Sequence, residues 1–119
     1  MITPIQNLNN IADNNIFIKR DDLIGFSFGG NKVRIAKEFF DDMNKKGCNC
    51  IIGYGSSRSN LCRAIANMSY AMNVPCHIIS PAEDDGSRVT SSNSTLVQNS
   101  NVKIHYCNKN DVAQTVESV

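Results

Sequence analysis

The chain has 119 residues, of which 41% are hydrophobic and 19% are charged, and its formal net charge is +1. This composition is typical of a globular domain, and the balanced charge gives no basis for a nucleic-acid or membrane-surface partner. No apolar run approaches the ~18 residues that cross a bilayer, and the N-terminus lacks a secretory signal. We therefore expect a cytoplasmic protein without a membrane segment.

Strand and helix patterns alternate along the chain. The expected elements are a strand at 16–20, a helix at 32–46, a strand at 50–54, a helix at 59–73, a strand at 76–80, a polar helix at roughly 87–100, a strand at 102–107 and a helix at 111–119 capped by Asp111. A turn-like acidic segment, 80–88, precedes the polar helix. Alternation at this spacing favours βαβ units, and so an α/β fold with an open parallel sheet and flanking helices.

Two of the expected helices have apolar residues at helical spacing, which predict their buried faces. The first set is Val33, Ala36, Phe40 and Met43 with Phe39 beside them, and the second is Leu61, Ile65, Met68 and Met72. Gly47 is a typical stop for the first helix, and Ser59 is a typical N-cap for the second.

The five cysteines indicate reduced thiols, because they are odd in number and lack the density of a disulfide scaffold. Zinc sites usually use cysteine pairs about two to four residues apart, whereas Cys48 and Cys50 form a single Cys-x-Cys. Cys50 and Cys76 lie in or beside strand patterns, where a buried thiol behaves as a small hydrophobe. We expect no metal site, and a structural role for His77 and His105 as well.

The stretch SFGGNKVR, residues 27–34, joins a loop to a helix whose first charged residue is Lys32. Gly29 and Gly30 remove side chains where a backbone turns tightly or approaches a ligand. The partial positive charge of a helix N-terminus disfavours a protonated lysine, and a neutral amine is the nucleophile that Schiff-base chemistry requires. Lys32 is therefore a candidate nucleophile, although a surface lysine after a glycine loop is also common.

A second candidate site follows the strand at 50–54, which leads into Gly-x-Gly. The polar residues before the next helix are Ser56, Ser57, Ser59 and Asn60. Ligands of open α/β sheets bind beyond the carboxyl ends of strands, and helix N-termini bind anions, so a substrate carboxylate fits here. Tyr54 lies at the same strand end and is a candidate pocket residue. A serine-capped helix would by itself explain only Ser59.

The two sites together resemble a known family. The blocks are KRDD at 19–22, GGNKVR at 29–34 and SNLCR at 59–63, within a resemblance that spans about residues 3–72. They resemble the pyridoxal-phosphate enzymes of the tryptophan-synthase-β type (fold type II). Within that group they are most similar to the 1-aminocyclopropane-1-carboxylate deaminase and D-cysteine desulfhydrase family.

The resemblance implies roles for individual residues. Lys32 would form the Schiff base with pyridoxal 5'-phosphate and then act as acid and base at the substrate carbon. Asn60 would hydrogen-bond the phenolic oxygen of the cofactor, and Ser59 would face the substrate and hold its carboxylate or move a proton. Ser59, Asn60 and Tyr54 would bind the substrate. Arg34 and Arg63 match family positions, and each is expected to pair with a nearby carboxylate.

The implied reaction is ring opening or α,β-elimination of a small amino acid. It would release ammonia and a 2-oxo acid, or sulfide from D-cysteine, in a homodimer when the protein is full length. Leu61 departs from the pattern, because family members commonly place a polar Gln or His there, and leucine cannot donate a hydrogen bond to a substrate carboxylate.

Family members are longer, two-domain chains. The resemblance therefore implies that residues 1–46 are an N-terminal segment of the large domain that carries the Schiff-base lysine. Residues 47–119 would be the small α/β domain, incomplete at its C-terminus. We expect such a fragment to be inactive by itself.

Two alternatives stay open. One is another fold type II enzyme, such as a threonine-synthase-like or cysteine-synthase-like protein, although these usually carry Ser where Asn31 stands. The other is a non-catalytic α/β domain that binds a small amino acid or a protein partner, which Leu61 and the short chain favour.

Overall fold

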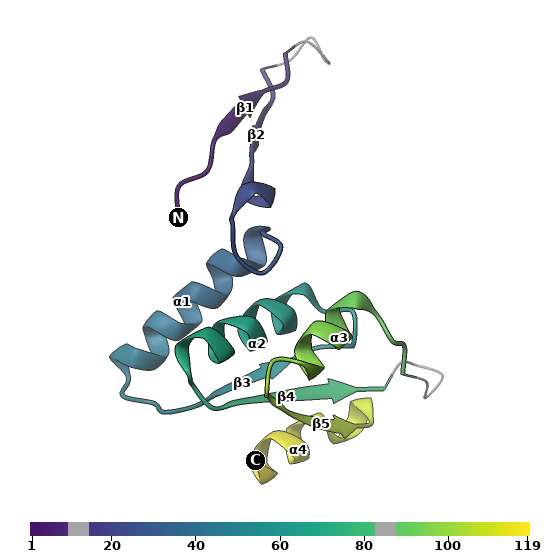
Figure 1. The fold of residues 1–119 in the computed structure, drawn as a ribbon. Coiled ribbons are helices and arrows are strands. Elements are labelled where there is room, and N and C mark those ends of the chain that lie inside the picture. The colour runs from purple at the N-terminus through teal and green to yellow at the C-terminus, as the bar shows by residue number, and fades with distance from the viewer. Residues whose placement is uncertain (10–14, 83–87) are drawn as a thin grey trace.

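The computed structural model describes residues 1–9, 15–82 and 88–119 (Figure 1). Its base is a parallel sheet in the order β3-β4-β5, with β3 at Ile51–Tyr54, β4 at Cys76–Pro81 and β5 at Lys103–Cys107. One face of the sheet is covered by α2 (Asn60–Met72) and α3 (Ser92–Gln98), and the other by α4 (Val112–Ser118). α1 (Asn31–Lys45) packs on α2. This is the predicted α/β fold with an open parallel sheet.

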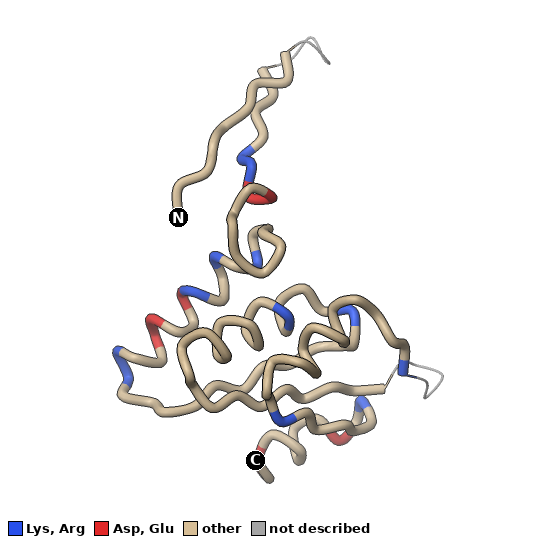
Figure 2. Tube along the Cα trace, viewed as in Figure 1, with Lys and Arg blue, Asp and Glu red and all other residues tan. Residues whose placement is uncertain are grey.

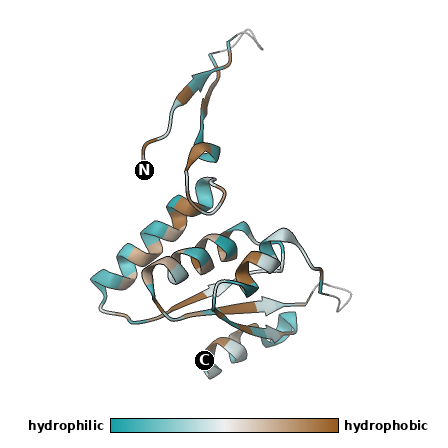
Figure 3. Ribbon diagram, viewed as in Figure 1, coloured by the Kyte–Doolittle hydropathy of each residue, from teal (hydrophilic) through white to brown (hydrophobic). Residues whose placement is uncertain are grey.

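The strand predicted at 16–20 lies outside the parallel sheet. β2 (Phe17–Lys19) pairs antiparallel with β1 (Ile5–Asn7), a strand that was not predicted. A parallel pairing of β2 with β3 would need α1 as a crossover helix on the sheet, but α1 packs on α2 instead. The β1–β2 hairpin extends away from the helices, and apolar side chains on it, including Ile5 and Phe17, are exposed (Figures 1 and 3).

The predicted buried face of α1 is confirmed. Its buried residues are Val33, Ala36, Phe40 and Met43, whereas Phe39 is 48% exposed. The helix ends at Lys45, and Gly47 follows with a φ of 68° that suits glycine. Lys37 pairs with Asp41 and Lys46 pairs with Asp42. Basic and acidic residues alternate along α1 in Figure 2.

The predicted buried face of α2 is only partly correct. The buried residues are Cys62, Ala64, Ile65, Ala66 and Ser69. Leu61 and Met68 are half-buried, and Met72 is 46% exposed. α2 contacts α1, α3 and the sheet, so its small residues are enclosed on several sides. A single-stripe pattern describes a helix with one buried face, and α2 has more than one.

The prediction of buried cysteine thiols in the strands is confirmed for Cys76 and is wrong for Cys50. Cys76 is 5% exposed and burial raises the pKa of its thiol, as it also does for Cys62. Cys50 is exposed, because it precedes the edge strand β3. On the adjacent strands β4 and β5, His77 Nδ1 lies 2.9 Å from His105 Nε2. Burial, followed by the charge of His105, lowers the pKa of His77.

α4 begins at Val112, next to the predicted start, whereas α3 begins at Ser92 and not at about residue 87 as predicted. Most of the predicted acidic turn falls on residues 83–87, outside the described residues. Asp111 precedes α4 without a side-chain capping bond, because its carboxylate accepts from Asn108 Nδ2 at 3.2 Å. No helix in the described part of the chain has the length and apolar character to cross a membrane. The division at residues 46 and 47 stays a prediction.

A half-buried ion pair connects the start of α1 to the short 3₁₀ turn η1 (Asp21–Leu23). Arg34 contacts Asp21 with two parallel bonds, Nε to Oδ2 at 2.7 Å and Nη2 to Oδ1 at 2.8 Å. Arg34 also donates to Thr3 Oγ1 and to the carbonyl oxygen of Met1. The Asp21 side chain is 17% exposed. The prediction that Arg34 pairs with a carboxylate is confirmed, and the pair joins the N-terminus, η1 and α1.

Asp21→Asn tests this pair through acid unfolding. The hydrogen bond from Arg34 is the main cause that lowers the pKa of Asp21 from 3.8 to about 2. A lowered folded-state pKa means that the stabilisation is complete above pH ~3.8 and is lost as the pH falls toward ~2. The free energy of unfolding, measured with urea from about pH 5 down to pH 2, should fall in the wild type. Most of that fall should disappear in Asp21→Asn.

The matched control is Asp42→Asn, which removes an exposed pair with Lys46 on the same helix. It should retain the wild-type acid slope. An unchanged slope in Asp21→Asn would show that the Arg34–Asp21 pair does not form in solution.

Candidate active site

The loop before α1 folds back on η1. Gly29 N–H donates to Phe26 O at 2.8 Å, and Gly30 N–H donates to Asp21 O at 2.7 Å. Four consecutive residues, Ser27 to Gly30, have positive φ. A Cβ at Gly29 would lie 2.6 Å from the carbonyl oxygen of Asp22, whereas nothing lies within 4 Å of a Cβ at Gly30. The first glycine is therefore required by the chain itself, and open space surrounds the second.

Lys32 is the second residue of α1 and is half-buried. It forms no hydrogen bond or ion pair with any described residue, although four other charged residues of the same helix are paired. The first turn of α1 has no acidic residue to neutralise it. The amine is thus left available to a ligand.

The second predicted site forms the corner between β3 and α2. Ser59 is the N-cap of α2, and its Oγ accepts from Cys62 N–H at 3.1 Å, as predicted. A Cβ at Gly55 would lie 2.8 Å from Ser59 Oγ and 2.9 Å from Cys62 Sγ. The glycine after β3 therefore allows the capping serine to lie directly against the strand end.

Arg63 connects the two candidate sites. Its Nη2 donates to the carbonyl oxygen of Gly29 at 3.4 Å, and its Nη1 donates to Asn60 Oδ1 at 2.9 Å. The same Nη1 donates to Asn93 Oδ1 at 3.0 Å. Ser27 Oγ adds a further contact from the loop to α2, donating to Asn67 Oδ1 at 2.7 Å. The prediction that Arg63 pairs with a carboxylate is wrong: it binds two amides and a backbone carbonyl.

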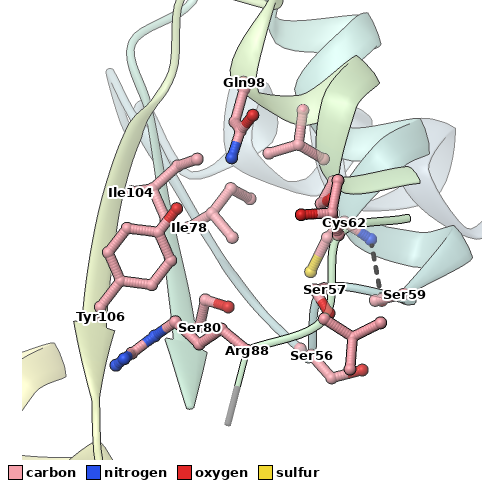
Figure 4. Close-up of a pocket in the computed structure, with 15 residues that line it drawn as sticks. Ser56, Ser57, Ser59, Cys62, Ile78, Ser80, Arg88, Gln98, Ile104 and Tyr106 are labelled. Atoms are coloured by element: carbon pink, nitrogen blue, oxygen red, sulfur yellow. Dashed lines mark hydrogen bonds between the residues drawn. The ribbon is translucent and has the colours of Figure 1, made fainter. Parts of the chain in front are cut away.

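A small cavity lies behind the corner, between the sheet and α3 (Figure 4). Its volume is about 90 Å³, and Ser59 lines it while Lys32, Asn60 and Tyr54 do not. Ser57 Oγ is buried there without a hydrogen-bond partner among the described residues. The guanidinium carbon of Arg88 lies 4.8 Å from the centre of the Tyr106 ring at one side of the cavity.

Tyr54 lies elsewhere. Its side chain is 57% exposed and lines a separate groove with Leu61 and Phe39. Of the predicted site residues, the loop before Lys32 is linked through Arg63 to Asn60, the residue after Ser59, while Tyr54 faces different neighbours. Its role in a substrate pocket stays a prediction.

The sequence patterns did not single out Asn93. It is one of several asparagines in the polar segment around α3, and no motif marks it. Only the three-dimensional contact with Asn60 and Arg63 distinguishes it from its neighbours.

The parallel sheet, the glycine loop and the Ser-Asn corner define the class of protein. Residues 2–118 match the family model described as pyridoxal-phosphate dependent enzyme, and the chain belongs to this family. Family members use pyridoxal 5'-phosphate as cofactor. The fold is that of the fold type II enzymes.

The chain is similar to individual relatives and solved structures of this family. Over 61 residues, 49% of the chain, it is 43% identical to a protein of Pyrococcus horikoshii provisionally named 1-aminocyclopropane-1-carboxylate deaminase, and the match covers 19% of that relative. The crystal structure of an ACC deaminase homologue matches 99% of the chain with a TM-score of 0.78 and 24% identity. A serine racemase of Dictyostelium discoideum matches with a TM-score of 0.72 and 18% identity over 99% of the chain. The chain spans 36% and 37% of these two structures.

The residues present fit one end of the cofactor. Pyridoxal phosphate has an aldehyde that needs an amine and a phenolic oxygen that needs a hydrogen-bond donor. Lys32 offers an amine without a partner among the residues that the structure describes. Asn60 Oδ1 is occupied by Arg63 and Asn93, which leaves its Nδ2 as a donor. The donor set therefore matches the aldehyde and phenol side of the ring.

Comparing Gly29→Ala with Gly47→Ala separates the effect of a close atomic contact from the effect of backbone strain. The two glycines have φ of 69° and 68°, so alanine costs about 1–2 kcal/mol of free energy of unfolding at either position. Only at Gly29 would the new Cβ meet a carbonyl oxygen, whereas Gly47 has nothing within 4 Å. We expect Gly29→Ala to lose a further ~1 kcal/mol or more in urea denaturation. Equal losses would contradict a tight contact between the loop and η1.

Proposed function

We propose that this chain carries the lysine segment and the small domain of a pyridoxal-phosphate-dependent deaminase or lyase that acts on a small amino acid. The observation that supports this best is the contact of Arg63 with both Gly29 O and Asn60 Oδ1, at 3.4 and 2.9 Å. It holds the loop of the candidate nucleophile against the candidate donor to the cofactor. The name of the Pyrococcus relative supports deamination by ring opening.

The bound cofactor supplies an electron sink for the bond that breaks at the α carbon of the substrate. Lys32 Nζ would bind the aldehyde carbon and, once displaced by the substrate amine, move a proton at the substrate carbon. Ser59 would orient the substrate carboxylate, because a hydroxyl group that accepts from Cys62 N–H through Oγ can also donate its hydrogen. The products would be ammonia and a 2-oxo acid, with sulfide as a further product when the substrate is D-cysteine.

Leu61 limits how the substrate carboxylate is held. Leucine has no polar side chain to offer at the position after Asn60. Leu61 is instead half-buried, packs against the core and lines the groove of Tyr54. The acid group would then be held by Ser59 and by free N–H groups at the start of α2. We further propose that the full-length protein is a cytoplasmic homodimer and that these 119 residues alone do not turn substrate over.

Leu61 also favours the second candidate, a non-catalytic domain of the same fold that binds a small amino acid or a protein partner. The two candidates differ in whether Lys32 reacts with the cofactor. To distinguish the two candidates, one must measure whether the cofactor becomes covalently attached to Lys32, rather than whether substrate is turned over.

Lys32→Ala provides that measurement. The purified chain with added pyridoxal phosphate should gain the visible absorbance of a lysine-bound cofactor, and Lys32→Ala should lose most of it. Borohydride reduction followed by peptide mass mapping should place the added mass on the peptide that contains Lys32, because its amine has no competing partner.

Lys45→Ala, at the exposed other end of α1, is the matched control and should retain the absorbance. Circular dichroism should show that both variants fold. A label spread evenly over the surface lysines, or unaffected by Lys32→Ala, would contradict the enzyme proposal and support the binding domain.

A further inference from the structure

Three side chains from two helices form a closed hydrogen-bonded group, which we call the amide cluster: Asn60 and Arg63 of α2, and Asn93 of α3. Arg63 Nη1 donates to Asn60 Oδ1 at 2.9 Å and to Asn93 Oδ1 at 3.0 Å. Asn93 Nδ2 donates to Asn60 Oδ1 at 2.9 Å and to the carbonyl oxygen of Arg58 at 2.8 Å. Asn60 Oδ1 therefore accepts from two donors at once.

The chemistry of Arg63 determines which atom each amide presents. A guanidinium group has five N–H donors and no acceptor, so the atom of a carboxamide that faces it must be the oxygen. This fixes Asn93 with Oδ1 toward Arg63, and its Nδ2 is then the atom that reaches Asn60. Both neighbours of Asn60 thus require its oxygen, and its Nδ2 points away from them. Asn60 Nδ2 has no partner among the described residues.

An exposed asparagine is ordinarily free to exchange its oxygen and nitrogen positions by rotating about its terminal bond. Asn60 is exposed, yet rotation would direct Nδ2 at two N–H donors, one from Arg63 and one from Asn93, and would leave both without this acceptor. The amide cluster therefore selects one of two orientations that otherwise differ little in energy.

We propose that Arg63 and Asn93 are positioning residues that lock the carboxamide of Asn60 with its NH₂ group toward the cofactor, as the donor to the phenolic oxygen. This inference rests on the proposed function. It gives a positioning role to two residues that act through Asn60 and do not contact the cofactor themselves. The opposite orientation would place Oδ1 against a phenolic oxygen that carries negative charge. The orientation of the Asn60 carboxamide would therefore change the affinity for the cofactor directly. Arg63 also holds Gly29 O, so one guanidinium aligns the donor with the loop that leads to Lys32.

Asn93→Asp tests the lock in the chain without cofactor. The introduced carboxylate can only accept, so it keeps its bond to Arg63 but presents an oxygen to Asn60. Asn60 should then rotate and donate through Nδ2. In side-chain ¹⁵N–¹H spectra, the NH₂ protons of Asn60 should exchange freely with water in the wild type and become protected in Asn93→Asp. Asn99→Asp makes the same change just after the other end of α3, where the Asn99 side chain donates to Thr95 O, and should leave the Asn60 signals unchanged.

A pair of Arg63 variants separates orientation from packing and covers the case in which Asn93→Asp fails to fold. Arg63→Met retains much of the volume but has no donor, whereas Arg63→Lys retains donors only. Asn60 should become mobile in Arg63→Met and stay ordered in Arg63→Lys, as reported by heteronuclear relaxation of its NH₂ group. The reverse order, or Asn60 signals that are the same in all variants, would overturn the lock.

Titration with pyridoxal phosphate then tests the consequence. Affinity, followed by the visible absorbance of the bound cofactor, should fall about tenfold or more in Asn93→Asp and Arg63→Met and stay near the wild-type value in Arg63→Lys and Asn99→Asp. Unchanged affinity in folded Asn93→Asp and Arg63→Met would overturn the positioning role. If the wild-type chain does not bind the cofactor, both the proposed function and the role of the phenolic oxygen as acceptor are refuted. The spectra recorded without cofactor would still decide whether the carboxamide of Asn60 is locked.

Discussion

A single guanidinium group holds the candidate site together. Arg63 reaches the carbonyl oxygen of Gly29, 34 residues away in sequence, and in the same conformation binds the side-chain oxygens of Asn60 and Asn93. Each of these acceptors belongs to a different segment: the loop before α1, the start of α2 and the start of α3. Because arginine donates in a fixed planar fork, satisfying all three acceptors constrains the segments relative to one another.

The loop can meet Arg63 only because other contacts hold it in a conformation that a free chain would rarely adopt. Residues 27–30 all have positive φ, and two of them, Ser27 and Phe28, have side chains for which that region is unfavourable. The cost is offset where Asp21 accepts from Gly30 N–H through its backbone and from Arg34 through its carboxylate. The KRDD and GGNKVR blocks are thus two halves of one folded unit, and the conformation of the loop before Lys32 depends on a residue eleven positions earlier.

The elements were predictable from the sequence where one physical effect dominates. Runs of β-branched and apolar residues predicted the bounds of β3, β4 and β5 to within about two residues. The buried face of α1 was predicted correctly because this helix buries residues on one side. The prediction was wrong where several neighbours compete: α2 is enclosed by two helices and the sheet, so Cys62 and Ser69 are buried and Met72 is not. β1 was missed because three residues carry too little periodicity to detect. Within the site, glycine loops and serine caps have local signatures, whereas Asn93 acts through contacts with residues about 30 positions away and leaves no local signal.

The position of Asn60 and Arg63 within the first turn of α2 has a consequence for how this segment can vary. A helix advances by about 100° per residue, so two side chains three positions apart project from nearly the same side. Inserting or deleting one residue between them would move the amide out of reach of the guanidinium. The same change at residues 56–58 would keep the spacing of Asn60 and Arg63, but it would disturb the bond from Asn93 to the carbonyl oxygen of Arg58. Length variation should therefore be tolerated less between residues 60 and 63 than before the cap.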